Sequence, residues 1–331
     1  MTAPLASIVL LTYRQEAFVE EALRSLLKQD WPNFEIIIAD DGSPDRTLEV
    51  IGKTLASVQT TVPVRVLSSV VNHGLATNWN RAVEAAAGEV IIASAGDDTS
   101  DPERVRRSME LFAADPDCQA LYFCCRTIDA QGRIMENPWR PLHQIQRRAL
   151  DAVTLWKGFY FNGATAAYRT SMLRAFGPID PRCGTEDVSS VVRAQLLGSA
   201  VVYPEVLVNW RWHGANLSHG SQAAGVTKAL KIKAKLRQAR GAHHDGRQLV
   251  KDAASAASIS TRSSQALATV RRSGNRISVL NRLKFHSLHP RSRWSVLGVL
   301  VFRLLACADV SKVEGVICSA KAVARRLSVA R

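Results

Sequence analysis

The 331-residue sequence predicts an α/β protein with a doubly wound, mostly parallel sheet, followed by a mainly helical C-terminal tail. First, short apolar runs alternate with segments of helical periodicity over the first hundred residues, and strands that alternate with helices pair in parallel. Second, 47% of the residues are apolar and 22% are charged, which is typical of a chain that forms a core. Third, the excess of basic residues lies entirely beyond residue 220.

The first hundred residues are expected to contain four strands and three helices. Apolar runs rich in β-branched residues predict buried strands over Ser7–Thr12, Phe34–Ala39, Val64–Leu67 and Val90–Ala93. Apolar residues at helical spacing predict helices over Glu16–Gln29, Asp45–Val58 and Leu75–Ala87. Further along, the same patterns predict a helix over Val188–Leu197 that starts at Asp187. They also predict a strand over Val201–Trp210 that Pro204 interrupts.

Charge divides the chain into a near-neutral body and a basic tail. Residues 1–220 carry 21 Lys and Arg against 25 Asp and Glu, a net charge of −4. Residues 221–331 carry 22 against 4, a net charge of +18. We therefore expect an α/β domain over 1–220 and a basic, mainly helical extension over 221–331. Such asymmetry indicates an anionic surface as a partner, and a solvated helical face is the alternative.

Three segments of the tail carry separate expectations. Lys228–Arg240 predicts a helix, and residues 252–270, rich in Ala and Ser, predict a weak helix or a linker. Trp294–Ala308 is apolar, has basic flanks and is too short to cross a bilayer, so it suits a helix lying in a membrane interface. Residues 280–331 are therefore expected to attach to an anionic membrane surface. Packing on the α/β domain, or a contact between copies, is the alternative.

Composition and motifs argue against several kinds of binding site and targeting signal. An aromatic content of 6% argues against a stacking surface for single-stranded nucleic acid, so a nucleic acid partner is not favoured. The six cysteines lack zinc-site spacing and are expected to be buried free thiols. The N-terminus does not have the pattern of a signal peptide. A cytoplasmic location is expected, with peripheral attachment to the inner face of the plasma membrane through the tail.

Polar side chains follow three of the predicted strands. Thr12-Tyr13-Arg14 ends the first, Asp40-Asp41 the second, and Gly96-Asp97-Asp98 the fourth. Ligands of such sheets bind beyond the carboxyl ends of the strands. Four carboxylates at one edge repel each other unless a cation or hydrogen-bond donors offset their charge. Because Mg²⁺ takes carboxylate and phosphate oxygens, this edge indicates a site for a nucleotide diphosphate.

Each acidic pair also has a structural interpretation. Asp40-Asp41-Gly42-Ser43 is ordinary turn chemistry. The segment Asp98–Asp101 suits the start of a helix near Pro102. The sequence contains neither GxGxxG nor GxxxxGK[ST], which excludes the usual dinucleotide and P-loop motifs.

A set of motifs in fixed order covers about residues 5–220. They are Ser7-Ile-Val-Leu-Leu-Thr-Tyr-Arg-Gln-Glu16, Ala39-Asp-Asp-Gly-Ser-Pro-Asp45, Asn72-His-Gly-Leu-Ala-Thr-Asn-Trp-Asn80, Ala87-Gly-Glu-Val-Ile-Ile-Ala-Ser-Ala-Gly-Asp-Asp98, Asn162-Gly163, Gly184-Thr-Glu-Asp187 and Trp210-Arg-Trp-His-Gly-Ala-Asn-Leu-Ser218. In this order the sequence resembles the family 2 glycosyltransferases, which have the GT-A fold. Their members transfer a sugar from a nucleotide diphosphate donor, usually with inversion and a divalent metal.

The resemblance implies a role for each matching residue. Thr12, Tyr13 and Glu16 border the nucleoside, Asp40 accepts a hydrogen bond from the base, Asp97 and Asp98 form the acidic motif with Asp98 as the metal ligand, His213 approaches the diphosphate or the metal, and Asp187 is the general base. Mn²⁺ or Mg²⁺ is the implied cofactor. The implied acceptor is a saccharide or a lipid-linked sugar, in polysaccharide or glycolipid synthesis.

Departures from the family pattern leave other interpretations open. Arg14 stands where Asn is usual, Ala95 where a further Asp can occur, and Trp79 where Arg often precedes Asn80, so the identity of the nucleobase is open. Asp187 and His213 could instead be purely structural, and Asn162-Gly163 could be a plain turn rather than part of the acceptor side. A non-catalytic scaffold that binds a nucleotide sugar, and a binder of anionic surfaces or nucleic acid through the tail, are the alternative functions.

Overall fold

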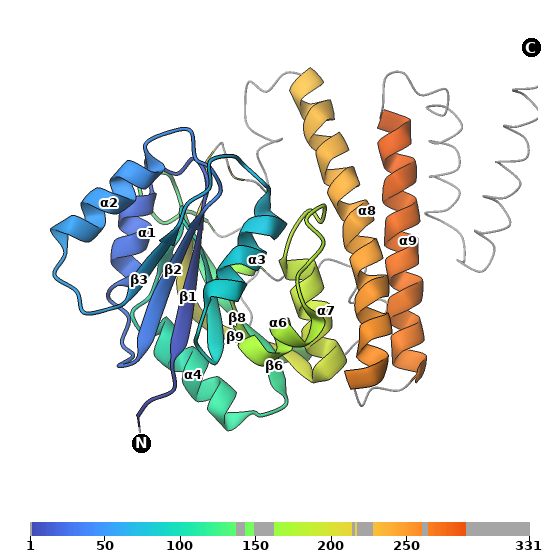
Figure 1. Cartoon of the computed structure of the whole chain (residues 1–331), viewed down its shortest axis with the longest axis horizontal. Helices are drawn as coiled ribbons and strands as arrows, with labels where there is room; N and C mark the ends of the chain where they lie inside the picture. Colours follow the sequence, from blue (N-terminus) through green and yellow to red (C-terminus); the bar gives the residue numbers. More distant parts are fainter. Residues whose placement is uncertain are drawn as a thin grey trace, which may run out of the picture.

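The computed structural model describes residues 2–136, 143–148, 162–213, 216, 228–259 and 264–288. A twisted sheet covered by helices forms the body, and two long helices stand side by side along one flank of it (Figure 1). The predicted interfacial helix Trp294–Ala308 lies outside the described residues. Of the segment 280–331, only the end of the last described helix is included.

The sheet has a parallel half and a mixed half. Its strands are β1 (Ala6–Thr12), β2 (Phe34–Asp40), β3 (Val64–Leu67), β4 (Val90–Ala95), β5 (Thr99–Ser100), β6 (Cys118–Ile128), β7 (Gln146–Arg148), β8 (Ala166–Arg169) and β9 (Ser199–Arg211). The order is β3-β2-β1-β4-β8-β6-β9-β5, and β7 pairs with β9. β1 to β4 pair in parallel, as predicted, and so do β6 and β9, whereas β8 runs antiparallel to both of its neighbours.

Helices cover both faces of the sheet. They are α1 (Val19–Leu26), α2 (Thr47–Ser57), α3 (Leu75–Ala85), α4 (Arg104–Ala114), α6 (Thr170–Phe176), α7 (Asp187–Leu197), α8 (Lys228–Ile259) and α9 (Ser264–Leu288), with a single 3₁₀ turn, η1, at Gly163–Thr165. All four predicted strands and all three helices between them are present. The first helix begins later than predicted because a turn, closed by the Phe18 N–H on the Gln15 carbonyl, precedes it.

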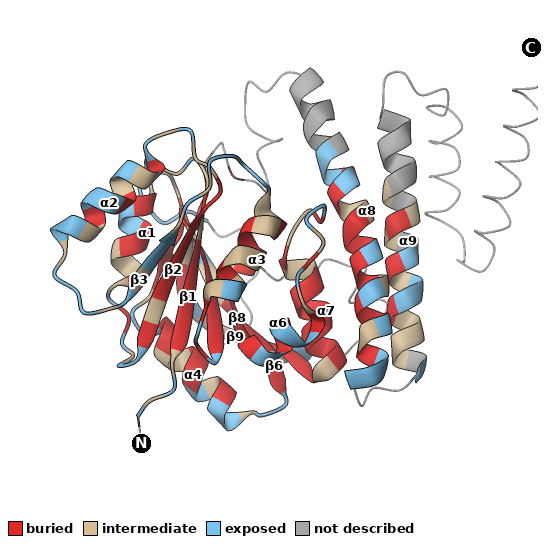
Figure 2. Ribbon diagram, viewed as in Figure 1, coloured by how far each residue is buried: buried red, intermediate tan, exposed pale blue. Residues whose placement is uncertain are grey.

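Alternation along the strands produces two core layers. Val9 and Ile37 point to the layer beneath α3, α6 and α7, while Ile8 and Ile36 point to the layer beneath α1, α2 and α4. β1, β2 and β4 are buried almost throughout, whereas the edge strand β3 is partly exposed (Figure 2). Burial on both faces explains why these strands show continuous apolar runs in the sequence.

Pro204 does not break its strand. β9 is continuous from Ser199 to Arg211, but its register with β6 shifts between the pairs Tyr203↔Phe123 and Val206↔Cys124. Pro204 has no N–H to donate, and the bulge removes it from the ladder. The predicted interruption is therefore a bulge inside one strand.

The tail begins with a helical hairpin. α8 continues to Ile259 and α9 begins at Ser264, so over 252–259 and 264–270 the structure agrees with the helix rather than the linker among the two predicted alternatives. Close packing of Gly246 on Gly274 joins the two helices, since a Cβ on Gly246 would lie 2.5 Å from the Gly274 carbonyl oxygen. Leu249 and Ala253 of α8 belong to the core layer beneath α7. The division of the chain at residue 220 stays a prediction.

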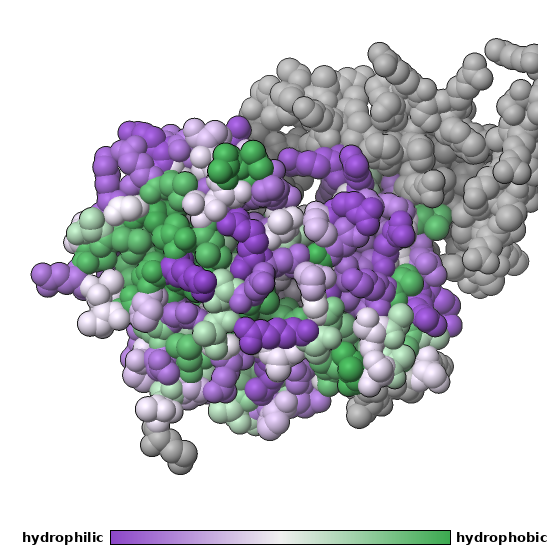
Figure 3. All heavy atoms as spheres, viewed as in Figure 1, coloured by the Kyte–Doolittle hydropathy of each residue, from purple (hydrophilic) through white to green (hydrophobic). Residues whose placement is uncertain are grey.

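The basic side chains that are described on the hairpin point to solvent. Exposed positions are Arg237, Arg240, Arg247, Lys251, Arg271 and Arg272. Hydrophilic side chains gather over the middle of the two helices on the face shown in Figure 3. For this part of the tail, the structure agrees with the alternative of a solvated helical face.

None of the helices in the described ranges is long and apolar enough to span a membrane. Cys118, Cys124, Cys125 and Cys183 form no disulfide; the first and last are buried as predicted, whereas Cys124 and Cys125 are only half-buried.

Candidate active site

The ends of β1 and β2 are joined through Asp40. Its carboxylate accepts hydrogen bonds from the Thr12 hydroxyl at 2.9 Å, from the Ser43 hydroxyl at 2.6 Å and from the Ser43 N–H at 2.9 Å. The next residue, Asp41, accepts the N–H groups of His73 and Gly74 at 2.8 Å each. Both carboxylates thus hold the turn together, as the structural interpretation of this motif expects. Recognition of a base by Asp40 stays a prediction.

The segment after β1 forms an exposed rim. Glu16 accepts the Arg46 N–H at 2.9 Å, and the Arg14 guanidinium lies 5.3 Å from the centre of the Tyr13 ring. Arg14 has φ = 57°, in the left-handed region, which Asn adopts more readily than most residues. The backbone therefore accounts for the Asn that is usual at this position of the family pattern. In this chain, the same backbone conformation presents a guanidinium at the rim.

β9 returns to the end of β4 and meets the acidic motif there. Asp97 Oδ2 lies 3.0 Å from His213 Nε2, and Asp98 Oδ1 accepts the Arg211 N–H at 2.8 Å. The Arg211 side chain donates from Nε to the Asp97 carbonyl at 2.8 Å. Antiparallel pairing of β5 with β9 sets this arrangement, because it places Ser100 opposite Val208. The structure thus brings three predicted site residues together.

Asp98 is held in a buried, negatively charged environment. Only 7% of its surface is exposed. Burial, and then the neighbouring charge of Asp97, raise the pKa of Asp98 well above its usual value, while the charges of Arg104 and Arg211 act in the opposite direction. Asp98 does not cap α4. The N-cap position of α4 is Glu103, and Asp101 closes the turn before it by accepting the Glu103 N–H at 3.0 Å, so Asp98 does not have the structural role that the sequence allowed it.

The second group of predicted residues lies at the start of α7. A Cβ on Gly163 would lie 2.6 Å from Glu186 Oε1 and 3.5 Å from Asp187 Cβ, so Asn162-Gly163 is in contact with the acidic pair. Asn162 caps the turn η1 by accepting the Ala164 N–H at 3.1 Å, and its side chain also bonds Cys125. Asn162-Gly163 thus forms a turn that also contacts the acidic pair, and its place on the acceptor side stays a prediction.

The two acidic side chains at this helix differ in environment. Asp187 is half-buried and accepts the Val188 N–H at 2.8 Å, while Glu186 is buried. Burial raises the pKa of both carboxyl groups, and the charge of Asp187 raises the pKa of Glu186 further. Because Asp187 is more exposed than Glu186 and accepts a backbone N–H, its environment favours the ionised form more than that of Glu186 does. The helix N-terminus favours the ionised form of Asp187.

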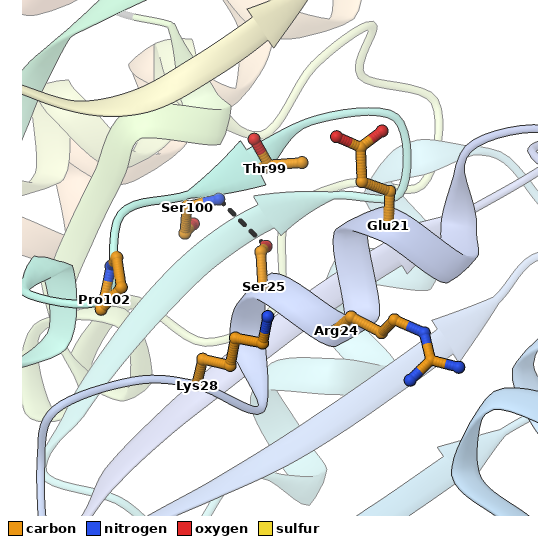
Figure 4. A pocket seen from close by; sticks show the side chains of 7 residues that line it. All are labelled: Glu21, Arg24, Ser25, Lys28, Thr99, Ser100 and Pro102. Atoms are coloured by element: carbon orange, nitrogen blue, oxygen red, sulfur yellow. Dashed lines mark hydrogen bonds between the residues drawn. The ribbon is translucent and has the colours of Figure 1, made fainter. Parts of the chain in front are cut away.

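A separate surface depression holds none of the predicted site residues. It has a volume of about 350 Å³ and is lined by Glu21, Arg24, Ser25, Lys28, Thr99, Ser100 and Pro102 (Figure 4). Its walls come from α1 and from the segment around β5, which the Ser100 N–H joins by donating to Ser25 Oγ at 3.1 Å. We do not assign the reaction to this depression.

Comparison with known proteins decides the family. Residues 7–177 match the sequence model for glycosyl transferase family 2. The chain belongs to this family. Among curated relatives of this family 2 chain, the chondroitin synthase of Pasteurella multocida is 31% identical over 134 residues, which are 40% of the chain and only 14% of the synthase. An uncharacterized glycosyltransferase of Nostoc sp. is 25% identical over 227 residues, 67% of the chain and 69% of that protein.

Solved structures confirm the GT-A fold of this family 2 chain. TarS of S. aureus, residues 1–349, matches with a TM-score of 0.59 at 16% identity over 95% of the chain and 89% of TarS. The mannosyltransferase PcManGT from Pyrobaculum calidifontis, in complex with GDP-Man and Mn²⁺, matches with a TM-score of 0.54 at 16% identity over 98% of the chain and 81% of that protein. TarS is also known in complex with UDP-GlcNAc.

The acidic motif of the family 2 chain fits a divalent cation by its chemistry. Carboxylates suit Mg²⁺ and Mn²⁺, and imidazole is a common metal ligand. Burial first, and then the charge of Asp97, raise the pKa of Asp98, and a bound cation would favour its ionised form. Among the residues that the structure describes, no three His, Cys, Asp or Glu side chains are grouped to hold a metal ion. Diphosphate oxygens would complete such a site, as they commonly do for Mg²⁺.

Sequence reasoning missed two residues around this site in the family 2 chain. Arg104 is buried and bonds the ends of β4 and η1, and Asp245 of α8 bonds the loop before α7. Arg104 had a signal in the sequence: it shares a helical face with the buried Ser108 and Phe112, four and eight residues on. Asp245 had no comparable signal, because its partner lies 61 residues away.

Proposed function

We propose that the chain is an inverting glycosyltransferase that moves a sugar from a nucleotide diphosphate donor to a hydroxyl group of a saccharide or lipid-linked acceptor. Polysaccharide or glycolipid synthesis is the proposed setting. One observation carries the proposal: Arg104 donates to the Ala93 carbonyl of β4, the strand that leads to the acidic motif, and to the Ala164 carbonyl, and the adjacent Gly163 contacts the Glu186-Asp187 pair. The acidic motif and the proposed base are thus joined through one short segment.

The donor side is assigned to the edge formed by β1, β2 and β4. Thr12, Tyr13, Glu16 and Asp40 would border the nucleoside, and Asp97 the diphosphate. Asp98 and His213 would hold Mn²⁺ or Mg²⁺. A bound cation supplies positive charge that offsets the charge developing on the diphosphate leaving group. Asp98 is suited to this task because its carboxylate is fixed by the Arg211 N–H before any ligand arrives.

Asp187 is assigned to the proton transfer. Inversion requires one base on the face of the sugar opposite the leaving group, and that base takes the proton of the acceptor hydroxyl. No covalent intermediate forms, so one carboxylate is enough. Glu186 keeps its proton at the pH where Asp187 is ionised, and it therefore does not compete for the proton of the acceptor.

Nucleotide binding tests the donor site directly. We expect one of UDP, dTDP and GDP to bind in the presence of Mn²⁺ and to lose its affinity in EDTA, as measured by titration calorimetry. The Asp98→Asn variant should weaken this binding by more than about tenfold, the scale seen when even outer partners of a metal are removed. Its Oδ1 can still accept the Arg211 N–H, so the fold should be kept.

Asp101→Asn provides the matched control for this titration. It makes the same chemical change three residues away, at a side chain that accepts the Glu103 N–H in the turn before α4. Its nucleotide affinity should equal that of the wild type. Binding that ignores both EDTA and Asp98→Asn would contradict the proposed metal dependence, and the absence of binding by all three nucleotides would contradict the proposed donor site.

A further inference from the structure

The first helix of the tail lies against the loop that leads into α7 (Figure 1). Asp245 of α8 accepts the Gly184 N–H at 2.9 Å, and the Thr185 N–H and the Cys183 thiol also bond its carboxylate. Asp245 is only 7% exposed. Burial raises its pKa to about 6, so the group is still ionised at neutral pH. Hydrogen bonds to a charged acceptor are stronger than those between neutral groups.

Two glycines bring the backbones of helix and loop into contact. A Cβ on Gly241 would lie 2.7 Å from Gly184 Cα, and a Cβ on Gly184 would lie 3.3 Å from Gly241 Cα. Any side chain at Gly241 would push α8 away from the loop. The close approach lets the Asp245 carboxylate, one helical turn further on, reach the loop N–H groups.

The same face of α8 is anchored to the body at two further points. Gln248 accepts the Asp180 N–H at 2.9 Å. Asp252 forms a two-pronged ion pair with Arg193 of α7, at 2.9 Å to Nε and 3.0 Å to the terminal nitrogen, and both side chains are buried. Residues 241, 245, 248 and 252 recur at helical spacing, so one face of α8 is devoted to α7 and to the loop before it.

We propose that Asp245 is a positioning residue for Asp187. On this proposal, α8 contributes to catalysis because it holds the segment that carries the base. The inference rests on the proposed function. Asp245 accepts the Gly184 N–H and its charge is also stabilised by the Thr185 backbone, and Asp187 follows two residues later at the first position of α7. α8 thus holds the loop before α7 through Asp245 and holds α7 itself through the Arg193–Asp252 ion pair. Small misplacements of a catalytic group are costly to the rate.

The full-length Asp245→Ala variant tests this role. We expect kcat to fall about 10- to 100-fold, with the KM for the donor and its calorimetric affinity within about twofold of the wild type. Hydrogen exchange at the Gly184 and Thr185 amides should become faster. Asp245→Asn, whose Oδ1 can still accept one N–H, should recover part of kcat. Arg247→Ala, an exposed change two residues further along α8, is the control and should leave all of these values unchanged.

The outcomes separate the positioning role from the proposed function. Unchanged kcat in Asp245→Ala, with a wild type that transfers sugar, contradicts the positioning role alone. Unchanged amide exchange in the loop contradicts it as well, whatever the rate. A fall in kcat accompanied by an equal loss of donor affinity also overturns it, because a general loosening of the fold would then explain the result. A wild type that transfers no sugar from any donor contradicts the proposed function itself.

Discussion

Asp187→Asn is expected to lower kcat by about 10²- to 10⁴-fold, the usual contribution of a general base, while donor affinity stays within about twofold. The amide cannot take the proton of the acceptor hydroxyl. It can still accept the Val188 N–H that Asp187 accepts at 2.8 Å, so the start of α7 should be preserved. Rates measured at saturating donor, together with calorimetric titration of the donor nucleotide, check the two halves of this prediction.

Glu186→Gln is the matched control for the base. Since Glu186 keeps its proton while Asp187 ionises, replacing it by an uncharged amide should change kcat far less than Asp187→Asn does. Turnover of the wild type should rise with pH as Asp187 loses its proton, because the base form exists only above its pKa. An ordinary aspartate titrates at about pH 4. Burial raises the pKa of Asp187, so the rise in turnover should occur at a higher pH than that.

The two variants should differ in their pH profiles as well as in their rates. In Glu186→Gln, the rising limb should stay at the pH of the wild type, because the residue that it replaces is neutral over that range. If Glu186→Gln loses turnover while Asp187→Asn keeps it, Glu186 rather than Asp187 is the general base. Equal and small effects from both variants would show that the general base does not lie at the start of α7.

Local patterns explain why the parallel half of the sheet was predictable. β1, β2 and β4 are buried on both faces and appear as largely apolar runs, the edge strand β3 is half-exposed, and the helices between the strands keep one apolar face. The strand ends then predicted where Asp40, Asp97 and Asp98 lie. The sequence could not predict which groups Asp40 bonds, because a turn and a base-binding site require the same residue types. The structure shows that its carboxylate accepts hydrogen bonds from Thr12 and Ser43.

The mixed half of the sheet depends on contacts between distant residues. β8 is a four-residue strand inserted antiparallel between β4 and β6, and nothing in its own sequence specifies those neighbours. The extent of α8 was underestimated for a similar reason. Residues 252–259 have weak helical signals, and they are helical where Asp252 meets Arg193 and Ala253 meets the core. Tertiary packing decides such segments more than propensity does.

Arg104 is the clearest case of a residue whose importance only the fold shows. Its guanidinium donates to the Ser94 and Ser100 hydroxyls at 3.2 and 2.9 Å, and to backbone carbonyls of Ala93 at 2.6 Å and Ala164 at 2.8 Å. Burial lowers the pKa of Arg104 to about 10, so the side chain stays charged at neutral pH. One side chain thus joins the strand that leads to the acidic motif with the segment that carries Asn162-Gly163.

Arg104→Met is therefore expected to reduce the free energy of unfolding by about 3–5 kcal/mol, the loss typical of removing one partner from a buried charged network. Methionine fills similar space but leaves buried carbonyls without donors, each at a cost of about 1–3 kcal/mol. Urea unfolding measures the change. Arg106→Met, two residues along the same helix, removes exposed ion pairs to Asp30, Glu103 and Glu110 and should cost no more than about 1 kcal/mol.

The comparison between these two arginines distinguishes a specific network from a general effect of charge on α4. Both variants remove one positive charge and introduce the same side chain, so helix propensity and net charge change alike. Equal losses would mean that the buried hydrogen bonds of Arg104 contribute little beyond its packing. A large loss for Arg104→Met alone would show that the core beneath the acidic motif is held by a charged group. The ends of β4 and η1 would then be held together by Arg104 before any donor binds.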